Sequence, residues 1–159
     1  MAIATYEVRG GKFHMNNHEV ISILIDLIET CKDGEECFRD AAEHIANSEF
    51  RRLFSIFVQQ RGQFVQELQA EIHRLGGDTN NVVGMGGKLH RTWMNLKAAM
   101  VRDEASIIRE CQREEESSVN DYQEALKADL PLDVQYVVKR QYMDIKDAYD
   151  RIRILQRAA

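Results

Sequence analysis

The spacing of hydrophobic residues along this chain is typical of long amphipathic helices. From residue 21, apolar or small side chains recur three or four positions apart for about seven turns, and only a helix places such positions on one side. The members of this first stripe are Ile21, Leu24, Ile28, Cys31, Phe38, Ala42 and Ile45. Asn16 followed by Glu19 fits a capping box, which predicts that the first helix begins there.

A second helix is predicted after Asn47-Ser48, which interrupts the first stripe and can cap the next helix. Its apolar stripe is rich in phenylalanine. The members are Phe50, Phe54, Phe57, Phe64, Leu68, Ile72 and Leu75. Gly76-Gly77 predicts the end of this helix, because glycine readily adopts the left-handed conformation that closes many helices.

Two further long helices are predicted after a Gly/Asn-rich loop over residues 78–88 and a short amphipathic helix around Trp93. Asp103 can cap the third helix, and Pro131 fits the first helical position of the fourth. The third stripe contains Ile107, Cys111, Ser118, Tyr122 and either Ala125 or Leu126. The fourth contains Val134, Val138, Ile145, Ile152 and Leu155. No segment shows the alternation of a strand.

The predicted fold class is all-α, a four-helix bundle. Tight links near residues 47–48 and 129–130 predict antiparallel pairs, whereas the long link over 77–102 predicts a helix-containing crossover between helices two and three. We expect residues 1–15 to form an N-terminal arm and residues 16–158 to form one bundle domain.

Composition excludes several classes of protein. The 159 residues carry 21 basic and 26 acidic side chains, and this mild acidic excess argues against nucleic-acid binding. The most apolar run, over residues 20–28, is short and contains Asp26, so we expect no membrane span. Three sparse cysteines form no disulfide framework or zinc pattern. We expect reduced, partly buried thiols and a cytoplasmic protein.

Polar residues within the apolar stripes carry the chemical information. Glu35, Arg61 and either Glu114 or Glu115 each lie midway between two apolar stripe positions on the first three helices. In a crossover bundle these residues lie about three turns from the same end, and Tyr149 falls near that level. We therefore predict one buried polar cluster of Glu35, Arg61, Glu115 and Tyr149. Gln141 is a further polar residue on the fourth stripe.

Two interpretations of this cluster compete. Carboxylates inside a four-helix bundle can hold a di-iron or di-manganese centre, which uses a Glu-x-x-His motif on each of two helices. That motif is missing at every helix centre here. An alternative iron or manganese site would use Glu36, Glu67, Glu115 and Asp144. The arginine favours an ion-pair cluster instead, because a guanidinium stays charged and would repel a metal cation.

Several stretches resemble a bacterial family of uncharacterised ferritin-like four-helix-bundle proteins. These stretches are DLIETCKDGEE (26–36), ELQAEI (67–72) with RLGG (74–77), LHRTWM (89–94) and DRIR (150–153). The resemblance covers about residues 18–157 and implies a ferritin-like fold, but it implies no activity. Relatives tend to have histidine at the position of Tyr149, so the resemblance also weakens a metal interpretation.

The favoured function is a non-enzymatic structural or interaction role, linked to stress, without a cofactor. We expect a homo-oligomer, a dimer being the simplest form, with no nucleic-acid or membrane partner; the sequence identifies no protein partner. The alternative is a degenerate iron or manganese carboxylate protein that binds metal or acts as an oxidase. A lipid-binding bundle would need an apolar cavity, and the many phenylalanines predict a filled core instead.

Overall fold

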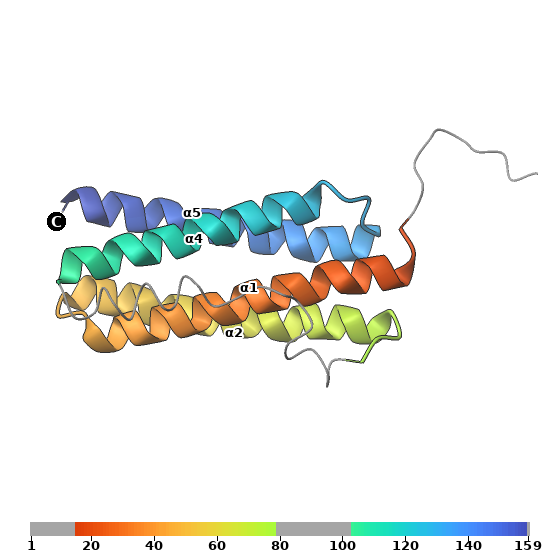
Figure 1. Cartoon of the computed structure of the whole chain (residues 1–159), viewed down its shortest axis with the longest axis horizontal. Helices are drawn as coiled ribbons and strands as arrows, with labels where there is room; N and C mark the ends of the chain where they lie inside the picture. The colour runs from red at the N-terminus through yellow and green to blue at the C-terminus, as the bar shows by residue number, and fades with distance from the viewer. Residues whose placement is uncertain (1–14, 79–102, 159) are drawn as a thin grey trace, which may run out of the picture.

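The computed structural model describes residues 15–78 and 103–158, and these residues form four helices and no strand (Figure 1). The helices are α1 (Asn17–His44), α2 (Ser48–Arg74), α4 (Glu104–Leu126) and α5 (Leu132–Ala158). They lie along a common direction as a four-helix bundle, the class that the sequence predicts. The predicted arm up to residue 14 and the predicted short helix around Trp93 lie outside the described residues.

Side-chain caps begin three of the helices where the sequence predicts them. The side-chain Oδ1 of Asn16 accepts from the backbone N–H of Glu19 at 2.9 Å, and the Glu19 carboxylate accepts from the Asn16 backbone N–H at 3.1 Å, which completes the capping box. Asn47 caps α2, and Asp103 caps α4 by accepting from the N–H of Ser106 at 2.7 Å. These bonds satisfy amides that a helix leaves without an internal partner.

The sequence predicts Pro131 as the first residue of the fourth helix, but the helix begins one residue later. The helix α5 begins at Leu132, and the Pro131 carbonyl accepts from the N–H of Gln135 at 2.8 Å. Proline therefore precedes the helix and supplies its first acceptor rather than its first helical residue. At the other predicted boundary, Gly76 follows α2 with a φ of +83°, which is the left-handed conformation expected of a glycine there.

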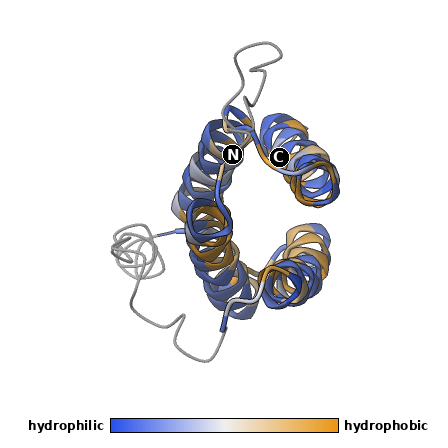
Figure 2. Ribbon diagram, turned by 90° about the vertical axis from the view of Figure 1, so that its right-hand side faces the viewer, coloured by the Kyte–Doolittle hydropathy of each residue, from blue (hydrophilic) through white to orange (hydrophobic). Residues whose placement is uncertain are grey.

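The four helices surround a common centre, which is seen end-on in Figure 2. The helices α1 and α2 pack as one pair and α4 and α5 as another, while α1 also contacts α4 and α2 contacts α5. This leaves α2 diagonally opposite α4. The helix α2 ends at one end of the bundle and α4 begins at the other (Figure 1). Among the described helices, none combines the length and the apolar character that crossing a membrane requires.

The hydrophobic core consists of two clusters that meet near the middle of the bundle. One cluster contains Leu24, Ile28 and Leu68, and the other contains Phe54 and Ile152, together with their neighbours. Polar residues lie on α2 and α4 where one cluster gives way to the other. These fully or almost fully buried residues are Arg61, Glu114, Glu115 and Ser118. A charged layer thus crosses the interior between the two hydrophobic clusters.

Candidate functional site

The centre of this layer is an ion pair between Arg61 of α2 and Glu115 of α4. Each residue is 0% exposed, and the Arg61 Nη2 group donates to Glu115 Oε1. Because α2 and α4 are diagonal partners, the long arginine side chain reaches across the middle of the bundle. A charged pair that joins two non-adjacent helices can favour one packing arrangement over others.

Apolar groups surround the guanidinium and occupy the space beside it. Its central carbon lies 5.7 Å from the ring centroid of Phe38 and 5.8 Å from that of Phe64, distances at which cation–π attraction contributes. The aliphatic stem of Arg61 passes over Gly34, where an added Cβ would lie 3.8 Å from the arginine Cγ. The guanidinium is thus held by two rings and one carboxylate in the buried interior.

Burial is the largest single influence on the pKa of each member of the pair. It raises the pKa of Glu115, and the nearby Arg61 charge and its hydrogen bond oppose that rise without cancelling it. Burial would lower the pKa of Arg61, but Glu115 and the surrounding groups outweigh it, so the guanidinium stays charged. Arg61 Nε and Glu115 Oε2 are buried without a hydrogen-bond partner among the described residues.

Of the other two residues of the predicted cluster, Glu35 lies at the margin of the buried pair and Tyr149 lies outside it. Glu35 is on α1, its side chain is 26% exposed, and it accepts from Arg39 at 2.6 Å on the same helix. Its carboxylate lies 3.8 Å from where a Cβ on Gly62 would be, so it borders the α1–α2 contact next to Arg61.

Tyr149 lies outside the buried Arg61–Glu115 pair. Its ring is half-buried, and the guanidinium carbon of Arg153 lies 5.5 Å from the ring centroid. The preceding residue, Ala148, is 1% exposed and is the one that turns inward at this point of α5. One residue along a helix rotates a side chain by about 100°, which accounts for the difference.

A second buried polar group, which the sequence interpretation did not assemble, joins all four helices. The Tyr122 hydroxyl on α4 donates to Gln141 Oε1 on α5 at 2.7 Å and lies 3.1 Å from the Cys31 sulfur on α1. Gln141 in turn donates to the Phe64 carbonyl on α2 at 3.4 Å. The position of Tyr122 on an inward stripe could have indicated this group from the sequence, because a buried hydroxyl needs a hydrogen-bond partner.

The buried thiols of Cys31 and Cys37 are poor nucleophiles. Burial raises the pKa of Cys31 to about 11, and it also raises the pKa of Tyr122 well above the usual range. A hydrogen bond to Cys111, together with burial, raises the pKa of Cys37 well above its usual range. All three cysteines are free and buried, more deeply than the sequence predicts. Thiolate formation, which cysteine catalysis needs, is disfavoured at Cys31 and Cys37.

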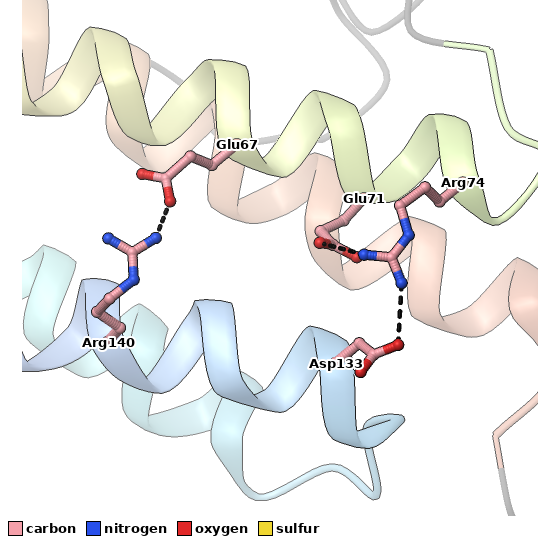
Figure 3. Close-up of polar contacts among 5 residues, drawn as sticks. All are labelled: Glu67, Glu71, Arg74, Asp133 and Arg140. Carbon is pink, nitrogen blue, oxygen red and sulfur yellow. Dashed lines mark hydrogen bonds and ion pairs between the residues drawn. The ribbon is translucent and has the colours of Figure 1, made fainter.

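Ion pairs connect α2 to α5 along the side of the bundle (Figure 3). Glu67 accepts from Arg140, whose side chain is 40% exposed. Arg74 donates to Glu71 at 3.0 Å on its own helix and to Asp133 at 2.9 Å on α5. Long charged side chains therefore bridge two helices whose backbones make the fewest close approaches of any neighbouring pair.

The residues of the alternative metal site are not brought together. Glu115 is paired with Arg61 and Glu67 with Arg140, while Glu36 is exposed on α1 and Asp144 is half-buried on α5. Across residues 15–78 and 103–158, no group of three or more His, Cys, Asp or Glu side chains is arranged to hold a metal ion. Arg61 contacts Glu115 in the interior, and a guanidinium there would repel a metal cation.

These features define an all-helical bundle with an arginine–glutamate pair in its core. A family model described as a domain of unknown function, DUF2383, matches residues 19–128, and since this is more than half of the chain, the chain belongs to the DUF2383 family. The matched segment contains α1, α2 and α4 and ends before α5. No curated protein gives a significant match.

Proposed function

We propose that this chain is a ferritin-like bundle with a non-enzymatic role, acting by association with other protein chains. The Arg61–Glu115 pair carries the proposal. A permanent positive charge, 0% exposed and in contact with the buried carboxylate, stands in the interior where a di-metal bundle would place its cations.

Two further features support this proposal. The arrangement in which α2 ends at one end of the bundle and α4 begins at the other is compatible with a ferritin-like crossover (Figure 1). Three free, buried cysteines support a reducing compartment such as the cytoplasm. A stress-linked role belongs to the proposal.

Metal analysis tests the proposal directly. The full chain is produced in cells supplied with iron and manganese, purified without chelator, and analysed by plasma mass spectrometry. We expect well below one equivalent of either metal per chain. About two equivalents per chain in the wild type, lost in Glu115→Ala but retained in Glu110→Ala, would overturn the proposal and favour the degenerate metal-carboxylate alternative. Glu110 is the matched control, because it is on the same helix and pairs with Arg113 near the surface.

A further inference from the structure

The helix α5 carries a second apolar stripe, on the side that faces away from the core. Four large apolar residues are strongly exposed there: Leu132 at 82%, Tyr136 at 71%, Met143 at 63% and Ile154 at 64%. The opposite side of α5 already fills the core through Val134, Val138, Ile145 and Ile152. A helix with one buried face needs only one apolar stripe, so the outer stripe calls for a partner of its own.

The outer stripe is symmetric about Met143. Leu132 lies eleven residues before Met143 and Ile154 eleven after, while Tyr136 lies seven before and Asp150 seven after. Lys139 and Asp147 lie four residues before and after it. At about 100° per residue, all these positions fall within about 40° of the direction of Met143, and they extend along roughly 33 Å of helix. They are exposed, so they form one continuous surface.

We infer that this stripe is where a second copy of the chain packs, with the two α5 helices antiparallel and the two Met143 side chains meeting on the two-fold axis. This inference rests on the proposed function, because it names the partner of the association. In an antiparallel pair, Leu132 meets Ile154 of the other copy, and Tyr136 can donate its hydroxyl proton to the Asp150 carboxylate.

Charge complementarity favours a second copy of the chain as the partner, and it favours an antiparallel arrangement of the two α5 helices. Antiparallel pairing places Lys139 of each copy opposite Asp147 of the other, which gives two attractive contacts by symmetry. Parallel pairing would instead place lysine against lysine and aspartate against aspartate. Asp147 also accepts from Arg151 on its own helix at 3.1 Å, but both side chains are more than half exposed, so that contact competes only weakly.

Sedimentation equilibrium of the full chain tests the inference. The protein concentration runs from about 1 to about 100 µM, because a single helix pair forms a small, weak interface. At the highest concentration we expect a mass of about twice 18.4 kDa. Met143→Glu puts two carboxylates together on the axis and should raise the dissociation constant at least tenfold. Ile56→Glu is the control, since Ile56 is an exposed apolar residue on α2, outside the stripe, and should leave dimerisation unchanged.

A charge exchange tests the pairing itself. Lys139→Asp and Asp147→Lys alone should each weaken the dimer at least tenfold, and the double variant should restore it. Circular dichroism confirms that each variant is folded. A wild-type mass of 18.4 kDa at 100 µM, a dimer that Met143→Glu leaves intact, or a double variant without rescue would overturn the inference. A metal-loaded dimer would overturn only the proposed function, and a metal-free monomer only this inference.

Discussion

Among single residues, Arg61 and Glu115 have the least freedom to change independently. Neither side chain has water to replace a lost partner, because both are completely buried. Glu115→Leu leaves an uncompensated guanidinium in the interior and should lower the free energy of unfolding by about 3–5 kcal/mol. Arg61→Met should have an effect of similar size. The double variant Arg61→Met/Glu115→Leu should recover most of that loss, because it replaces the pair by apolar groups of comparable volume.

Urea unfolding of the four proteins measures this coupling. Arg113→Ala provides a surface comparison, because Arg113 pairs with Glu110 but its side chain is 63% exposed, and its loss should change stability by less than about 1 kcal/mol. Additive effects of the two core substitutions would show that Arg61 and Glu115 do not act as a pair.

The ionisation of Cys31 makes the free energy of unfolding depend on pH in the alkaline range. Burial raises the pKa of Cys31 to about 11 in the folded chain, whereas the unfolded thiol ionises near 9.0. The folded state therefore keeps a proton that the unfolded state loses, and stability present below pH 9 falls as the pH rises towards 11, by up to about 1.4 kcal/mol per pH unit for this group. Urea midpoints at pH 8, 9 and 10 should fall less steeply in Cys31→Ala than in the wild type. Parallel pH profiles would contradict the assignment.

At the scale of helices, two glycines should respond in opposite directions to the same substitution. Gly76 has a φ of +83°, so Gly76→Ala should destabilise the end of α2 by about 1–2 kcal/mol. Gly34 lies inside α1, and a Cβ there would meet the Arg61 stem at 3.8 Å, an ordinary contact distance. Gly34→Ala should therefore stabilise α1 by about 0.5–1 kcal/mol through helix propensity alone.

Thermal unfolding of both variants, followed by circular dichroism, shows whether each substitution raises or lowers the stability of the protein. A destabilised Gly34→Ala protein would mean that the arginine stem needs the space that glycine leaves. A neutral Gly76→Ala protein would mean that the end of α2 adjusts to the new side chain.

The helices could be predicted from the sequence to within a few residues, because capping residues and three-four periodicity are local signals. The prediction for Arg61 and Glu115 had the same origin: both interrupt apolar stripes, and the structure pairs them in the interior. Tyr149 could not be placed in this way, since whether it or Ala148 turns inward depends on how α5 rotates against its neighbours. Likewise, the contact of Cys31 with Tyr122 depends on the relative height of α1 and α4, which no local pattern encodes.

For the whole molecule, the hydroxyl of Tyr122 acts as a junction. It contacts α1 and α5 directly, and Gln141 extends the connection to α2. Tyr122→Phe leaves the Gln141 carbonyl without this donor and should lower global stability by about 1–3 kcal/mol. Native-state hydrogen exchange should show the slowest amides of all four helices accelerated together, by roughly tenfold or more.

Tyr142→Phe is the comparison, because the Tyr142 hydroxyl accepts from the exposed Gln123 at 3.0 Å. It should leave the slowest amides unchanged. Acceleration confined to α4 in Tyr122→Phe would show that the junction is local rather than shared by the bundle.

The position of α5 beyond the matched segment has a practical consequence. A fragment cut at residue 128 would remove Gln141 from Tyr122 and strip Val138, Ile145 and Ile152 from the interior. The inner surfaces of the three remaining helices would then face solvent, and such a fragment should aggregate or bind indiscriminately. An interaction screen with a fragment that ends at the family boundary would detect non-specific binding to these exposed apolar surfaces. The protein used in such a screen should therefore extend through residue 158.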